Sequence, residues 1–163
     1  MKKFFVASAL LCVMMVAGLA AALPNYAGTW VLDKDKSTGL PPQMMSSTDA
    51  IQWVVTQNDK TLTVKSAGMG GGQEYAYNLD GSKSKVQVAG RMPGEATIYL
   101  EKKDDGKIVL HSERTINFQG NDVTIKNTQA WELADGGKTL KVKQTVDSPR
   151  GTQEASLVFT LKS

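Results

Sequence analysis

The predicted fold rests on one stretch, Tyr26-Ala27-Gly28-Thr29-Trp30-Val31-Leu32-Asp33. Bulky apolar residues alternate here with smaller ones, so that Tyr26, Trp30 and Leu32 share one face of a strand. Gly28 has no side chain and lets the backbone approach a neighbouring strand closely. We therefore expect this stretch to be the first strand of a barrel around which the rest of the chain is arranged.

The composition is that of an ordinary globular domain. The chain has 163 residues, of which 41% are hydrophobic and 21% are charged, and this is enough for one domain with a real core. Its formal net charge of +3 includes Lys2 and Lys3, so the chain beyond them is almost neutral. This balance does not indicate a nucleic-acid partner.

The first 22 residues have the pattern of a secretory signal peptide. Lys2 and Lys3 precede an uncharged apolar run that ends in Ala20-Ala21-Ala22, and such an order is typical of a cleaved export signal. Reading the same run as a membrane anchor is the alternative. We expect cleavage after Ala22 and a single barrel domain over residues 23–163, located in the periplasm or secreted.

Export would leave a mature chain without a thiol. Cys12 is the only cysteine and lies inside the apolar run, where it follows the bulky Leu11 rather than a small residue. A lipid-modified cysteine is therefore not expected, and neither is a stable membrane anchor after cleavage. Stability in an oxidising compartment must then come from packing alone.

The rest of the chain predicts an all-β fold. From Ala50 onward, short runs of alternating apolar residues follow one another, as in Ile51, Trp53 and Val55, and no stretch keeps a helical period. Residues 34–49, with two prolines and Met44-Met45, are expected to form a long loop. We predict an up-and-down antiparallel β-barrel of about ten strands, with no major helix apart from the signal peptide.

The connections between the predicted strands alternate in kind. Every second one is a tight polar turn, as at Asp80-Gly81 and Asp105-Gly106, and in a meander alternate turns gather at one end. The other end carries looser loops and is the expected mouth of a cup. Its candidate portal residues are Met44, Met45, Met69, Arg91, Met92 and Arg150. Methionines adapt to varied apolar shapes; incidental exposure and a copper site are the alternatives.

An even strand count makes the first and last strands antiparallel. Residues 26–33 can then pair with residues 152–161 and close the sheet, which removes both edges. A flat open sheet or a two-sheet sandwich is the rival arrangement.

Gly28-x-Trp30 at the head of such a barrel resembles the opening motif of the calycins, the lipocalin and fatty-acid-binding superfamily. More narrowly, Lys36-Ser37, Trp131-Glu132-Leu133 and Pro149-Arg150-Gly151 are similar to segments of exported bacterial lipocalin-like proteins. The resemblance implies an internal cavity that binds a small apolar or amphipathic molecule. The chain departs from the lipocalins and the fatty-acid-binding proteins because neither the helix after the barrel nor the helical lid after the first strand is predicted.

Polar side chains interrupt the apolar faces of three neighbouring predicted strands: Ser112, Arg114, Asn127, Gln129 and Gln144. Counting through the hairpin between residues 107–118 and 122–133 places Gln129 opposite Ser112 and, through the next hairpin, Gln144. The same count places Asn127 near Arg114. We expect a polar belt midway up the inner wall.

The belt fits the head of an amphipathic ligand. A guanidinium is a forked donor suited to a carboxylate, so Arg114 would meet the head, and Tyr75 and Tyr77 could add hydroxyls. In the alternative interpretation, these groups bind one another and buried waters, or a bulge turns Arg114 outward. Trp30, Trp53, Trp131 and Phe159 are interpreted as core rather than as ligand stackers.

The sequence offers little for catalysis or for a metal. His111 is the only histidine and falls on the outward face, away from Ser112. Asp33-Lys34-Asp35-Lys36-Ser37 begins like a calcium loop but lacks the later Gly and Glu. We expect no cofactor, no metal and no enzyme, although Arg114 and the tyrosines leave room for an isomerase or lyase.

The prediction is an exported, monomeric, lipocalin-like binding protein for a small hydrophobic or amphipathic molecule. The alternative is a non-catalytic structural or protein-interaction module of the envelope, with a barrel packed solid.

Overall fold

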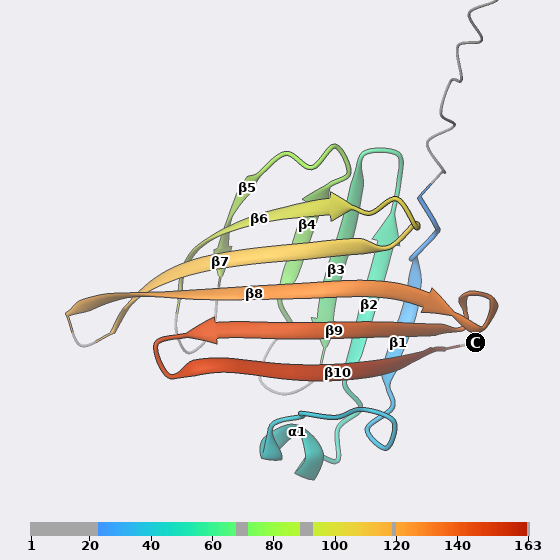
Figure 1. The fold of residues 1–163 in the computed structure, drawn as a ribbon, viewed down its shortest axis with the longest axis horizontal. Coiled ribbons are helices and arrows are strands. Elements are labelled where there is room, and N and C mark those ends of the chain that lie inside the picture. Colours follow the sequence, from blue (N-terminus) through green and yellow to red (C-terminus); the bar gives the residue numbers. More distant parts are fainter. Residues whose placement is uncertain (1–22, 68–71, 89–92, 119, 163) are drawn as a thin grey trace, which may run out of the picture.

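The computed structural model describes residues 23–67, 72–88, 93–118 and 120–162. The described strands form a ten-stranded antiparallel sheet in the order β4-β3-β2-β1-β10-β9-β8-β7-β6-β5 (Figure 1). They are β1 (Gly28–Leu32), β2 (Gln52–Gln57), β3 (Thr61–Ala67), β4 (Glu74–Asn78), β5 (Ser84–Val88), β6 (Gly94–Lys102), β7 (Ile108–Phe118), β8 (Asn121–Ala134), β9 (Thr139–Ser148) and β10 (Gly151–Leu161). The predicted all-β, up-and-down architecture is confirmed.

The sheet closes through its first and last strands. β1 pairs with β10 in the antiparallel sense, with Trp30 opposite Leu161 and Leu32 opposite Phe159. The two edges of the sheet are β4 and β5, and no ladder joins them in the described part of the chain. The molecule is therefore a nearly closed barrel rather than a flat sheet or a sandwich.

The opening strand is built as its sequence predicts. The backbone of Gly28 adopts a φ of 151°, and a Cβ added there would lie 2.4 Å from Cδ1 of Leu161. Only glycine permits this approach of β1 to β10. Tyr26 and Trp30 are almost fully buried, and the indole Nε1 of Trp30 donates to the carbonyl oxygen of Tyr26 at 2.9 Å.

Short turns and satisfied hydrogen bonds seal one end of the barrel, the tight end. The Tyr26 hydroxyl donates to the carbonyl oxygens of Gly106 (3.1 Å) and Trp131 (3.4 Å), and burial raises the pKa of Tyr26 to about 12. The side chain of Gln57 accepts from the Tyr26 N–H (2.9 Å) and donates to the Pro24 carbonyl (3.2 Å). These bonds tie the segment before β1 to β2, to β8 and to the turn between β6 and β7.

The segment between β1 and β2 differs from the expected loop, because it contains a short helix, α1 (Pro42–Ser46). Five residues carry no recognisable helical period, while proline in the first turn favours helical backbone. Among the described residues, no helix has the length and apolarity needed to cross a bilayer.

A strap formed by residues 33–40 leads to α1 and lies along β10. Thr38 and Ser156 exchange two backbone hydrogen bonds of 2.8 and 3.0 Å. The hydroxyl of Ser37, which is buried, accepts from the Val158 N–H at 3.0 Å. Gly39 has a φ of +72°, and a Cβ there would lie 2.3 Å from the Glu154 carbonyl oxygen. The strap fixes α1 at the loose end of the barrel.

Candidate functional site

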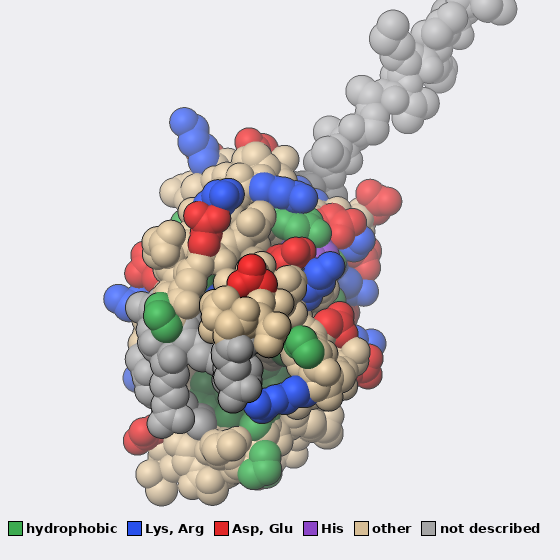
Figure 2. Space-filling model, turned by 90° about the vertical axis from the view of Figure 1, so that its left-hand side faces the viewer, with side chains coloured by type: hydrophobic (Ala, Val, Ile, Leu, Met, Phe, Trp, Pro, Cys, Tyr) green, Lys and Arg blue, Asp and Glu red, His purple; other side chains and the backbone are tan. Residues whose placement is uncertain are grey.

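The barrel lumen contains two chambers of about 220 Å³ each. The first, the polar chamber, is rich in hydrogen-bonding side chains: Ser66, Gln73, Tyr75, Tyr77, Ser112, Asn127 and Gln129. The second, the lid-side chamber, lies beneath Leu40, Pro41 and Met44 and is largely apolar. Figure 2 views the molecule from the end that carries the β7–β8 and β9–β10 hairpins, and apolar side chains are visible there inside a hollow.

Most of the predicted belt lines these chambers. Tyr75, Tyr77, Ser112 and Asn127 line the polar chamber, Gln144 lines the lid-side chamber, and Gln129 lines both. The inward-facing positions of four strands bring them together, because alternate residues of a strand face the same side. The structure thus places six of the seven predicted ligand-binding residues on the lumen wall.

The seventh, Arg114, also belongs to the inner face. Arg114 pairs with Ala96 of β6 and with Ile125 of β8, and both ladders continue without a break on either side of it. No bulge therefore turns it outward. Burial raises the pKa of the Tyr75 hydroxyl, and the positive charge of Arg114 opposes that rise.

The register of the belt differs in part from the expectation. Gln129 pairs with Gln144, as predicted, but it lies opposite Leu110, whereas Ser112 lies opposite Asn127. Phe118 pairs with Asn121, so Asn121 belongs to the strand and not to the turn. Moving a hairpin turn by one residue shifts the antiparallel pairing by two. Arg114 therefore lies two pairs closer to the β7–β8 turn, at the mouth, than Asn127 does.

Part of the belt is satisfied internally. The Gln144 side chain donates to Oδ1 of Asn127 at 3.1 Å, and the Trp131 indole donates to Oε1 of Gln129 at 3.1 Å. In the described part of the chain, neither the guanidinium of Arg114 nor the hydroxyl of Ser112 has a hydrogen-bond or ion-pair partner. The belt therefore combines side-chain amides that are hydrogen-bonded within the protein with two donors, on Ser112 and Arg114, that have no protein partner in the described ranges.

The two tyrosines of β4 differ in their bonding. The Tyr75 hydroxyl donates to Oε1 of Gln73 at 2.6 Å. Tyr77 is buried, and burial raises the pKa of its hydroxyl well above the usual range. Tyr77 is therefore neutral at physiological pH and can donate into the polar chamber.

The portal residues divide into three groups. Met44 lines the lid-side chamber, whereas Met45, the next residue of α1, is 53% exposed. Arg150 is exposed in the turn between β9 and β10. Met69, Arg91 and Met92 lie outside the described residues, as does the predicted signal peptide, residues 1–22.

Trp53 lies between two other rings. Its indole stacks on Trp131, with ring centroids 5.2 Å apart and planes 10° apart, and on Phe159 at 4.2 Å and 29°. Trp30, Trp131 and Phe159 are core residues as predicted. However, Phe159 also lines the lid-side chamber, and Trp53 lines both chambers. The sequence showed only that Trp53 shares the apolar face of its strand, which did not separate it from the core.

His111 faces outward, as its position in the strand predicts. Its ring stacks on Tyr99 with centroids 4.3 Å apart, and Nε2 lies 3.5 Å from a carboxylate oxygen of Glu101. Within the ranges that the structure describes, no group of three or more His, Cys, Asp or Glu residues could hold a metal ion.

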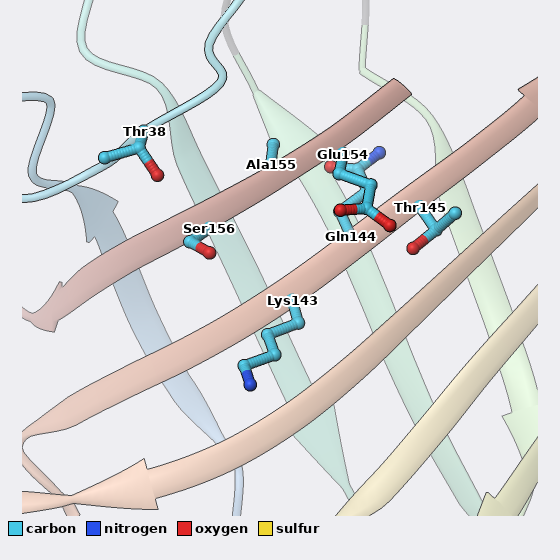
Figure 3. Close-up of a pocket in the computed structure, with 7 residues that line it drawn as sticks. All are labelled: Thr38, Lys143, Gln144, Thr145, Glu154, Ala155 and Ser156. Carbon is cyan, nitrogen blue, oxygen red and sulfur yellow. The ribbon is translucent and has the colours of Figure 1, made fainter. Parts of the chain in front are cut away.

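A further hollow of about 440 Å³ lies on the wall formed by β9, β10 and the strap (Figure 3). The side chains of Lys143, Thr145 and Glu154 point away from the sheet there, while Gln144 and Ala155 point to its other side. This hollow is open to solvent and has no apolar enclosure, unlike the chambers. No sequence pattern predicts this hollow, because it forms where the strap leaves β10.

Neither a protein-family model nor a curated protein sequence matches the chain. Its fold matches solved structures. The zebrafish ileal bile acid-binding protein complexed with cholic acid has a TM-score of 0.55 at 14% identity, and the match covers 84% of this chain and 98% of that one. A fatty acid transporter designated REP1-NXSQ has a TM-score of 0.54 at 10% identity, over 84% and 96% of the two chains.

A third match is the apo form of lipid binding protein 8 from Caenorhabditis elegans, with a TM-score of 0.53 at 15% identity over 84% of this chain and 95% of that one. At these identities the likeness concerns the fold. The chain therefore shares the ten-stranded β-barrel fold of these binding and transport proteins.

Proposed function

We propose that this protein binds a small amphipathic, anionic molecule in its lumen and does so without catalysis. One observation carries the proposal: Arg114 lies on the inner face of β7, two residues from Ser112, and has no carboxylate partner in the described part of the chain. A half-buried cation without a partner is unfavourable unless something else compensates its charge. A ligand carboxylate would supply that charge and accept two parallel hydrogen bonds from the guanidinium.

The two chambers match the two halves of such a ligand. Ser112 and Gln129 offer hydrogen bonds in the polar chamber, while Leu40, Met44 and Phe159 supply apolar contacts in the lid-side chamber. Small-molecule sites commonly combine an apolar lining with a few placed polar groups. The chambers also count against the alternative of a barrel packed solid.

The structural matches support the same class of ligand. The three matched proteins are named for binding or transporting bile acid, fatty acid or lipid. We extend to this chain only the common feature of their ligands, an apolar body with a polar end. We also propose that the protein works outside the cytoplasm as a monomer, on the strength of residues 1–22 and the sequence pattern alone.

The test compares a charged and a neutral ligand with the same chain. Dodecanoate and dodecanol would be titrated by calorimetry against the native protein, Arg114→Ala and the control Lys138→Ala, whose lysine is exposed at the tight end. We expect Arg114→Ala to weaken dodecanoate binding about 10- to 100-fold, because hydrogen bonds to charged groups contribute about 1.5–3 kcal/mol. Dodecanol binding should change far less, and Lys138→Ala should affect the binding of neither ligand. Equal losses for both ligands in Arg114→Ala would contradict the proposed head site.

A further inference from the structure

We propose that Trp53 is the specificity-determining residue of the lumen. It forms one side of a fixed constriction between the chambers and admits flexible single chains while excluding rigid multi-ring amphiphiles. This inference rests on the proposed function, because it concerns the shape of the molecule that the lumen takes.

The constriction is defined by the residues that the two chambers share. Only Trp53 and Gln129 line both the polar and the lid-side chamber among the described residues. Trp53 comes from β2 and Gln129 from β8, so the passage runs between side chains on different parts of the wall. A ligand with its head near Arg114 and its tail under Met44 must pass between them.

Neighbouring groups hold both sides of the passage in place. The indole of Trp53 is stacked between Trp131 and Phe159, and both of these are buried. The Nε1 of Trp131 donates to the side-chain oxygen of Gln129 at 3.1 Å. The buried Trp131 therefore contacts both sides of the passage, and Trp53 cannot rotate aside without losing its stacking contacts with Trp131 and Phe159.

The chamber volumes indicate why the constriction selects by shape. Each chamber is about 220 Å³, which is below the roughly 300 Å³ at which small-molecule pockets usually begin. A ligand that gains full contact must therefore occupy both chambers. An unbranched chain can bend through a narrow passage, whereas a fused-ring body cannot narrow at its middle.

The experiment compares two anions of different shape, dodecanoate and cholate, by calorimetry with the native protein and Trp53→Leu. We expect the native protein to prefer dodecanoate by about tenfold or more, which is the scale of discrimination that an apolar pocket can achieve by shape. In Trp53→Leu this preference should fall by about tenfold, because the smaller side chain opens the passage. The ratio of the two affinities is the readout, since a general loss of binding would lower both.

Two further variants keep the outcome decisive. Val54→Ala alters the next residue of β2, which is 39% exposed, and it should leave the ratio unchanged. If Trp53→Leu does not fold, Trp53→Phe keeps an aromatic ring in the stack and should shift the ratio in the same direction by a smaller factor. The inference is overturned if the folded variant keeps the native ratio, or if the native protein binds cholate as tightly as dodecanoate. If the native protein binds neither anion, the proposed function fails, and the inference fails with it.

Discussion

The two ends of the barrel differ in how completely their polar and apolar groups are packed and hydrogen-bonded. At the tight end, the hydroxyl of Tyr26 bonds to the backbone of Gly106 and Trp131, and the amide of Gln57 bonds to the backbone on either side of Asn25. Trp30 itself is almost fully buried. At the loose end, Arg114 lacks a partner in the described part of the chain, Met45 is largely exposed, and two chambers remain. The contrast indicates that one end supplies stability and leaves the other free to hold unsatisfied groups.

The largest expected effect comes from breaking the tight end. Trp30→Ala should lower the free energy of unfolding by about 3–5 kcal/mol, because it removes a buried indole and leaves a cavity. Urea unfolding followed by circular dichroism measures this. A loss below about 1 kcal/mol would mean that the tight end does not carry the stability.

A smaller effect should come from the strap at the loose end. Gly39→Ala should lower the free energy of unfolding by about 2 kcal/mol. The new Cβ would lie too close to the Glu154 carbonyl oxygen, and the alanine would have to keep a left-handed backbone. It should also weaken dodecanoate binding, since the strap positions α1.

Gly136→Ala is the matched control for the strap. Gly136 has a similar φ of +67° at the tight end, but nothing lies within 4 Å of an added Cβ there. Gly136→Ala should lower the free energy of unfolding by about 1 kcal/mol, from backbone strain alone, and should leave dodecanoate binding unchanged. Equal losses of binding in both variants would show that the strap has no special part in the site.

The smallest effect concerns one hydroxyl. Tyr26→Phe removes the bonds to Gly106 and Trp131 and should cost about 1 kcal/mol at neutral pH. Because burial raises the pKa of Tyr26 to about 12, its neutral form is favoured in the folded state. That stability is fully present below the unfolded pKa of about 10 and is lost as the pH rises toward 12.

Unfolding titrations between pH 9 and pH 12 would check this. The native protein should lose stability more steeply over that range than Tyr26→Phe does. Parallel curves would contradict the assignment of a raised pKa to this hydroxyl.

The sequence predicted the barrel well because its signals are local. Alternation around Trp30 identifies a strand, and turns such as Asp80-Gly81 mark the hairpins, so strand order follows from the chain alone. The inner face of the belt was predicted for the same reason: Ser112, Gln129 and Gln144 each share a face with apolar neighbours.

Features that depend on exact pairing were harder to predict. One residue of error at the β7–β8 turn moved Asn127 from Ser112 to Arg114 in the expected register. α1 is too short to show a period. The burial of Ser37 depends on a hydrogen bond with Val158, which is 121 residues away in the sequence. The position of Trp53 between the two chambers depends on where the folded barrel contains cavities.

The seam between β4 and β5 has a mechanical consequence. In a fully closed barrel, inter-strand hydrogen bonds run around the whole circumference, and widening the lumen would require some of them to break. In this barrel the hydrogen bonding is interrupted between β4 and β5. The Asn78 side chain donates to the Ser84 hydroxyl at 2.9 Å near the tight end, and no ladder joins the two strands toward the mouth in the described ranges. In the described ranges, the strip of wall between β4 and β5 therefore lacks the inter-strand hydrogen bonds that resist widening elsewhere in the barrel, and this strip lies next to Tyr75.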